Sequence, residues 1–140
     1  MRWIAAGVVA LSTALAAQAP SDSAQPVATM KQLMLDLIHP ASNSLLLLIN
    51  RGGPDDEMQW AEARRSALTL AESGNLLIMR NRSAAWITDA RLLIDAGTAA
   101  YKAADAKDPK ALAALADRID VSCTTCHKQF RPTVFAPASR

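Results

Sequence analysis

The residues with the clearest chemistry lie near the end of the chain, in the stretch Cys123-Thr124-Thr125-Cys126-His127. Cys123 and Cys126 are the only cysteines of the protein, and His127 directly follows the second. Residues three and four apart share one face of a helix, so both thiols and the imidazole can address the same side. Two thiols at this spacing can bond to one edge of a porphyrin while the imidazole binds its iron. The pattern is that of a c-type haem attachment site.

Three other chemistries use the same residue types. A thioredoxin-like dithiol is expected beside a βαβ pattern, and no strand-like run lies nearby. A structural zinc site needs four protein ligands and would have to combine the whole motif with the distant His39. A disulfide between Cys123 and Cys126 would close a loop too small to stabilise much through loop entropy. We therefore expect one covalent haem c per chain, with His127 as an iron ligand.

The amino terminus has the pattern of a secretory signal peptide, because Arg2 precedes a short apolar run rich in small residues. Small residues at 14 and 16, and at 17 and 19, place the cleavage near residues 16–19, so residues 1–19 are assigned to the signal. The run is shorter than the ~20 apolar residues of a membrane span, and no anchor is expected after cleavage. Because c-type haem is attached outside the cytoplasm, the expected compartment is a bacterial periplasm.

Composition points to a single helical domain. The chain has 140 residues, 51% of them hydrophobic but only 4% aromatic, and alanine and leucine supply most of the apolar content. These residues favour helices, and the length suits one domain with a real core. The net charge of +2 comes from interspersed acids and bases, which gives no indication of nucleic-acid binding.

Residues 20–26 read as a disordered lead-in, residues 27–135 as the folded domain and residues 136–140 as a tail. Apolar residues recur at spacings of three and four along a first helix, namely Met30, Leu33, Met34, Leu37, Ile38, Ala41, Leu45 and Leu48. Pro40 predicts a kink or break near His39. The stretch Asn50-Arg51-Gly52-Gly53-Pro54 predicts the turn that ends this helix.

A second helix is expected from a cap at Asp55 or Asp56 to about Arg80. Its inner side is predicted to carry Trp60, Ala67, Leu68, Ala71, Asn75, Ile78 and Met79. Ser83 can cap a third helix that fades by Lys107.

Asp108-Pro109 supplies a cap and a first-turn proline for a fourth helix, which carries the cysteine motif near its end. Short connections between four helices imply an up-down-up-down antiparallel four-helix bundle. In that topology Met30, Met34, Met79 and Trp86 lie at the same end of the bundle as the motif. We therefore expect an all-α fold with the haem at one end.

The chain resembles the class II c-type cytochromes, which are four-helix bundles with this motif near the C-terminus. The resemblance rests on Cys123 to His127 with Phe130-Arg131 after it, and more weakly on Lys31-Gln32-Leu33-Met34. It implies that Cys123 and Cys126 anchor the haem and that His127 is the proximal ligand.

The low-spin members of that family supply a methionine as sixth iron ligand, and the resemblance assigns this role to Met34. Met30 and Met79 are the rival methionines, and core packing is the ordinary role of a methionine on an apolar helix face. Arg131 is expected to meet a haem propionate, although it could equally be a solvated arginine near a helix end. Trp86 completes the expected cofactor-binding residues.

The implied function is electron transfer with other periplasmic redox proteins, which would bind transiently at an exposed haem edge. If Met34 only packs, the alternative is a five-coordinate protein that binds NO or CO. An enzyme is not expected, because no distal pair of histidine and arginine is apparent. The resemblance also allows a homodimer through the first two helices, with residues 45–49 as one face.

Overall fold

The computed structural model describes residues 25–80 and 83–131, and within them the chain is helical without any strand. The all-helical fold class is therefore confirmed. The elements are α1 (Met30–Gln32), the π-helix η1 (Leu33–Ile38), α2 (His39–Asn50), α3 (Glu57–Arg80), α4 (Ala84–Asp105), α5 (Pro109–Ala113) and α6 (Ala116–Phe130). The predicted signal peptide, the tail and most of the lead-in lie outside the described residues.

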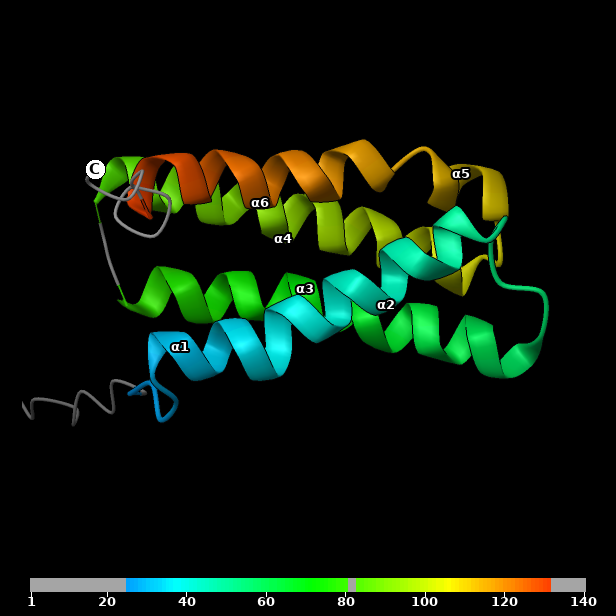
Figure 1. Cartoon of the computed structure of the whole chain (residues 1–140), viewed down its shortest axis with the longest axis horizontal. Coiled ribbons are helices and arrows are strands. Elements are labelled where there is room, and N and C mark those ends of the chain that lie inside the picture. Colours follow the sequence, from blue (N-terminus) through cyan, green and yellow to red (C-terminus); the bar gives the residue numbers. More distant parts are fainter. Residues whose placement is uncertain (1–24, 81–82, 132–140) are drawn as a thin grey trace, which may run out of the picture.

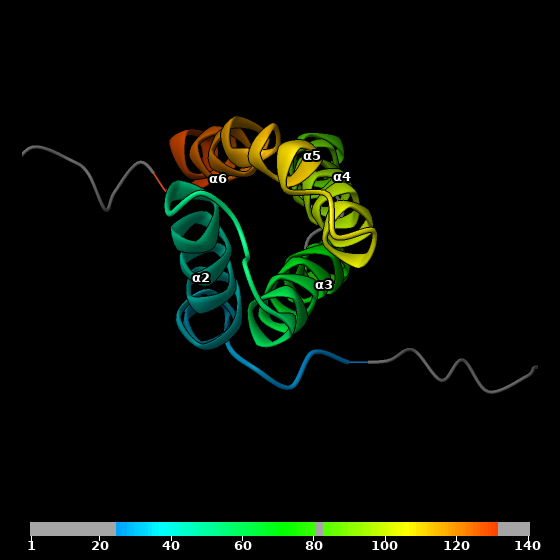
Figure 2. The ribbon, with the colours of Figure 1, turned by 90° about the vertical axis from the view of Figure 1, so that its right-hand side faces the viewer.

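The long helices lie side by side around one core. Figure 1 shows α2, α3, α4 and α6 extending along a common direction, and Figure 2 shows them end on, arranged around a shared centre. Contacts join α3 to α4, α2 to α3, α4 to α6 and α2 to α6, so the ring of helices is closed. Leu33, Leu45, Leu70, Leu112 and Ile119 have no exposed surface and fill the centre.

A capping box fixes the start of the first helix. The Thr29 hydroxyl accepts the backbone N–H of Gln32 at 3.2 Å, and the Gln32 side chain accepts the N–H of Thr29 at 2.9 Å. Both bonds satisfy donors that a helix start leaves unpaired. The helix therefore begins at Met30, one turn before Met34.

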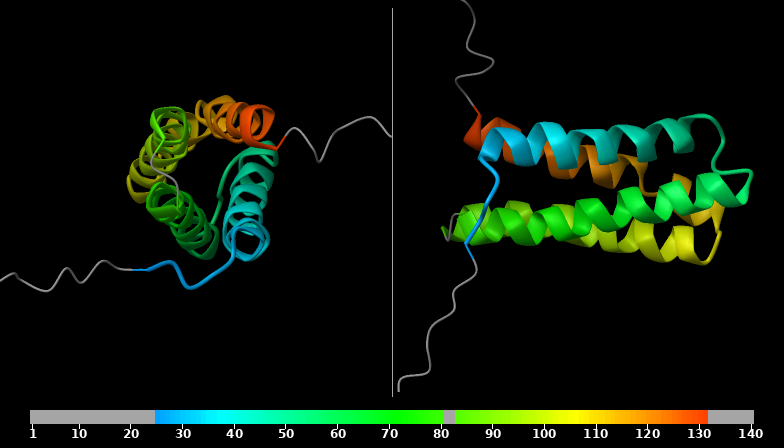
Figure 3. Two further views of the ribbon diagram at one scale, coloured as in Figure 1. Left: turned by 90° about the vertical axis from the view of Figure 1, so that its left-hand side faces the viewer. Right: turned by 90° about the horizontal axis from the view of Figure 1, so that it is seen from below.

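Pro40 does not break this helix. A proline has no N–H to donate and its ring crowds the carbonyl four residues back. Here the N–H of His39 bonds to the carbonyl of Met34, five residues earlier, and the chain widens into the π-helical turn η1 before α2 continues to Asn50. Figure 3 shows that the first helix is unbroken from α1 to the end of α2.

The π turn changes which residues face the core. It takes in one extra residue, so Leu33 and Ile38 are both buried although they are five positions apart. Leu37, expected on the inner face, is 39% exposed. That part of the predicted face is wrong, because a regular period of 3.6 residues does not hold across η1.

The turn after α2 is confirmed. Gly52 and Gly53 have φ angles of +104° and +99°, a region that glycine enters without a steric penalty. The N–H of Gly53 bonds back to the carbonyl of Leu48 at 2.9 Å and closes the helix end.

The cap of α3 is Asp56, whose carboxylate accepts the N–H of Gln59 at 2.7 Å.

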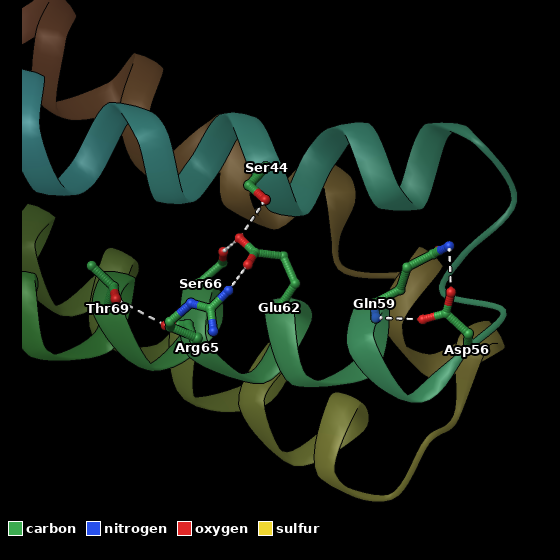
Figure 4. Close-up of polar contacts among 7 residues, drawn as sticks. All are labelled: Ser44, Asp56, Gln59, Glu62, Arg65, Ser66 and Thr69. Atoms are coloured by element: carbon green, nitrogen blue, oxygen red, sulfur yellow. Dashed lines mark hydrogen bonds and ion pairs between the residues drawn. The ribbon is translucent and has the colours of Figure 1, made fainter.

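Further along α3, the carboxylate of Glu62 accepts hydrogen bonds from Ser44 of α2 at 2.8 Å and from Ser66 at 3.1 Å, and it also pairs with Arg65. Figure 4 shows these contacts. The bond from Ser44 ties the first helix to α3 outside the apolar core, and the other two contacts lie within α3.

The helices α3 and α4 approach each other through small residues. A Cβ placed on Gly97 of α4 would lie 2.6 Å from the backbone nitrogen of Ala71 and 3.0 Å from the carbonyl oxygen of Ala67. A Cβ placed on Gly74 of α3 would likewise meet the side chain of Ile94 and lie 3.1 Å from the carbonyl oxygen of Ala90. The predicted face was partly wrong, since Leu68 is 46% exposed and Asn75 is also exposed.

Ser83 caps α4 through a bond from the N–H of Trp86 at 3.4 Å, and Asp108 caps α5 through the N–H of Ala111 at 2.9 Å.

The single fourth helix that the sequence predicts is divided into α5 and α6. At the division the N–H of Leu115 bonds to the carbonyl of Leu112, three residues back, at 3.1 Å. This tight turn keeps Leu112 and Leu115 both buried.

One helical segment among the described residues, Met30–Asn50, is long and apolar enough to cross a membrane by length and composition. Core helices of soluble proteins pass the same test. Leu33 and Leu45 of this segment are fully buried against the other helices, so its composition alone does not indicate a span.

We predict that Gly97→Ala destabilises the protein. Alanine gains about 1 kcal/mol of helix propensity, but the extra methyl group meets backbone that cannot rotate away, and overpacking costs about 1–3 kcal/mol. Urea unfolding followed by helical circular dichroism should show a lower midpoint. Thr98→Ala, at the exposed neighbouring position, should keep or raise the midpoint. Equal stability of Gly97→Ala and the wild type would contradict the close packing of α3 and α4.

Candidate functional site

The helix α6 presents the cysteine motif toward the core at one end of the molecule. Cys123, Cys126 and His127 are each partly buried, and both thiols are free. All three line one cavity together with Met34, which enters from η1. The structure thus brings the predicted methionine and the motif together, although 88 positions separate Met34 from Ser122, the first lining residue of α6.

The inner cavity is small and apolar. Its volume is about 30 Å³, and Ile38, Leu77 and Leu93 contribute much of its wall. Two outer hollows of about 230 and 380 Å³ share Met34 with it and also share Arg131 with each other. The larger one has a size at which small-molecule sites begin, about 300 Å³. An apolar interior with cationic Arg131 and Lys31 at the outer hollow fits a flat apolar molecule that carries acidic groups.

Burial is the main influence on the pKa of the two thiols. It raises the pKa of Cys123 above its ordinary value, while the hydrogen bond between Cys123 and Ser122 lowers it and the charge of Asp120 adds a smaller increase. Burial also raises the pKa of Cys126, and the charges of Asp89 and Cys123 add to the effect. Reactive or metal-binding cysteines have a lowered pKa. These thiols are therefore held in the protonated form at neutral pH.

The imidazole is shifted toward its neutral form. Burial lowers the pKa of His127, and the nearby Arg131 lowers it further. A neutral imidazole keeps a nitrogen lone pair with which it can bind a metal. The carbonyl of His127 accepts the N–H of Arg131 at 3.0 Å, which places the arginine directly after the last turn of α6.

The donor set does not suit a protein-only metal site. Across residues 25–80 and 83–131, no three histidine, cysteine, aspartate or glutamate side chains lie close enough to hold a metal ion. His39, needed for the zinc alternative, is exposed on α2. A porphyrin supplies four nitrogens of its own and needs only axial ligands from the chain. Two thiols, one imidazole and one thioether around a single apolar cavity fit that requirement.

The rival methionines are placed differently. Met30 lines only the largest outer hollow, whereas Met34 lines that hollow, the second one and the inner cavity. Met79 is partly buried at the end of α3 and lines none of these three spaces. Arg131 is exposed at the outer hollows, where the sequence analysis expects a contact with an acidic group.

Trp86 lies beside the site and does not line it. Its indole N–H donates to the carbonyl of Leu77 at 2.7 Å, and its ring meets Phe130 edge to face with centroids 4.8 Å apart. These contacts join α4 to α3 and to the end of α6. The structure therefore gives Trp86 a role in fixing the helix that carries the motif.

Asp89 is a residue of the site that was not predicted from the sequence. This side chain lies on α4, is only 6% exposed and lines the inner cavity with the motif. A signal was present, because Asp89 lies three residues after Trp86 and four before Leu93, on the inner face of the helix.

No family model, curated protein or solved structure matches this chain. What the site can do therefore follows from its own residues and their arrangement.

We predict that both thiols titrate at higher pH in the folded haem-free protein than in the unfolded chain. Iodoacetamide reacts with the thiolate, so alkylation at neutral pH should be slower in the folded state. The pH of the half-maximal rate should fall when urea unfolds the protein. This midpoint depends on the pKa of the thiols. Steric shielding in the folded protein lowers the alkylation rate equally at every pH and therefore does not move the midpoint. A lower midpoint in the folded state would contradict the assigned burial of the thiols.

Proposed function

We propose that this protein is a periplasmic monohaem cytochrome of the class II c type and that it carries electrons. The observation that supports this most is the shared cavity of Met34, Cys123, Cys126 and His127. An axial thioether, an axial imidazole and two attachment thiols are what such a haem needs from its protein. The cavity unites them from the first and the last helix.

The proposed fold is an up-down-up-down antiparallel bundle with the haem at one end. The connections at residues 51–56 and 106–108 are short, and short connections favour antiparallel neighbours. In that topology the early first helix lies beside the late fourth helix, as the lining of the cavity by Met34 and the motif requires.

Each side chain would have a defined task. Cys123 and Cys126 would form the thioether bonds, and neutral His127 would direct a ring nitrogen to the iron. Ile38, Leu77 and Leu93 would exclude water from the cavity. Arg131 and Lys31, at the outer hollow, would face the propionates.

The function follows from the ligands. A haem with histidine and methionine ligands supplies one-electron chemistry at a raised potential. Both ligands would stay in place in either oxidation state, so Met34 and His127 would rearrange little during transfer. The proposed partners are periplasmic redox proteins that bind transiently, and export would depend on the signal peptide at residues 1–19.

A homodimer through the first two helices is part of the proposal. Leu45 is fully buried in the core and cannot belong to such a face. Leu35 and Leu47 are 55% and 42% exposed on the first helix and could contribute to it.

We predict that haem is attached covalently to the exported protein. Acid-acetone extraction should leave the colour with the polypeptide, and mass spectrometry should show one haem adduct per chain. Cys123→Ala with Cys126→Ala should abolish the adduct completely. Thr124→Ala changes an exposed residue within the motif, keeps the spacing and should retain the adduct. An unmodified mass for the mature wild-type protein would disprove the cytochrome assignment.

We predict that Met34 is the sixth ligand. Ferric protein should be low-spin and show a weak sulfur-to-iron charge-transfer band at the red end of the visible spectrum. Met34→Ala should remove this band, lower the potential and open the iron to CO, because the variant lacks the thioether that would fill the sixth position. Met30→Ala and Met79→Ala should leave these properties largely intact.

A wild-type protein that is high-spin and binds CO readily would instead favour the alternative function, a five-coordinate protein for NO or CO. Loss of the band in Met30→Ala alone would keep the electron carrier and move the ligand by one helical turn.

A further inference from the structure

Asp89 is a carboxylate buried in the wall of the cavity. It lies on α4, is 6% exposed and faces the same space as Cys126 and His127. The other residues that α4 and α3 contribute to this wall are Leu93 and Leu77, both apolar. The surroundings of Asp89 therefore screen its charge much less than water would.

No side chain of the described residues compensates this carboxylate. Its Oδ2 atom is buried without a hydrogen-bond partner, and the ion pairs in residues 25–80 and 83–131 involve other acids. The Nε atom of Arg80 is also buried without a hydrogen-bond partner. The same guanidinium, however, donates through Nη2 to the carbonyl of Ala28 at 2.7 Å. Buried Ser122 likewise has a partner, the carbonyl of Ile119 at 2.7 Å.

An unpaired buried carboxylate costs free energy, and leucine at this position would avoid that cost. The field of Asp89 reaches the motif, because its charge contributes to the raised pKa of Cys126. A charge placed this way acts on whatever occupies the cavity.

We propose that Asp89 lowers the reduction potential of the haem by providing a buried negative charge beside it. This inference rests on the proposed function. With the neutral ligands His127 and Met34, ferric iron in a doubly negative porphyrin would have one net positive charge at its centre. One electron accepted from a reduced partner protein would remove that charge. Asp89 would therefore have a countercharge only in the oxidised form and would stabilise that form.

The effect opposes the increase in potential that a thioether ligand produces. Met34 and Asp89 would thus act in opposite directions on one cofactor from two helices. The final potential would depend on both side chains.

The test is a potentiometric titration of the holoprotein and its Asp89→Asn variant. The variant should have the more positive potential, by at least about 59 mV, which is a tenfold change in the one-electron equilibrium constant. Asp95→Asn removes an exposed carboxylate from the same helix and should shift the potential far less, because solvent screens its charge. Asp89→Glu keeps the charge and should stay near the wild type.

The haem-free protein gives an independent readout. There Asp89→Asn should raise the urea midpoint, because it removes an uncompensated buried charge, whereas Asp95→Asn should not. If Asp89→Asn does not accumulate as holoprotein, Asp89→Ser removes the same charge and serves for the titration.

These measurements distinguish the role of Asp89 from the cytochrome assignment on which it rests. A covalent haem whose potential is the same in the wild type and in the charge-removing variants would overturn the role of Asp89 and leave the cytochrome intact. If the protein carries no haem, both the role of Asp89 and the cytochrome assignment are wrong. A more positive potential in Asp89→Asn, with Asp89→Glu and Asp95→Asn near the wild type, would support the proposal.

Discussion

The missing N–H of Pro40 is the constraint on which the arrangement at the site depends. Because Pro40 cannot continue the regular hydrogen-bond ladder, the N–H of His39 reaches the carbonyl of Met34 and the first helix widens into η1. The extra residue directs Leu33 into the core, where it has no exposed surface, and leaves Met34 at the cavity wall. π turns occur frequently at functional sites, and here the turn contains the proposed ligand. A local defect in one helix thus determines which side chain faces the motif.

Burial at this end of the molecule accounts for the chemistry of several groups. The same low-polarity surroundings keep the thiols of Cys123 and Cys126 protonated and the imidazole of His127 neutral. They also make the charge of Asp89 effective over a longer distance than a surface carboxylate would achieve. Trp86 of α4 and Phe130 of α6 join the two helices at this end through their edge-to-face contact. The apolar wall and the buried charge would together set the properties of a haem held there.

Much of this organisation could be predicted from the sequence, because caps and spacing are local signals. Asp56, Ser83 and Asp108 cap helices as expected, and Met34 lies in the same cavity as the motif. The face of α3 was harder to predict, because Ser66 and Ser73 are buried although their polar side chains give no hydrophobic signal. The π turn was missed because a spacing of five between Leu33 and Ile38 matches no regular period. Asp89 was missed because the sequence does not show which charged residues lack partners.

In the proposed cytochrome, both axial ligands of a single iron come from one cavity. Iron X-ray absorption of the purified ferric protein tests this most directly, since the method counts the atoms around the metal and distinguishes sulfur from nitrogen. We predict the porphyrin nitrogens, one imidazole nitrogen and one thioether sulfur in the first coordination sphere. A sphere that contains nitrogen neighbours alone, with the sixth position open or filled by water, would contradict the role of Met34. A protein that contains no iron would contradict the whole assignment.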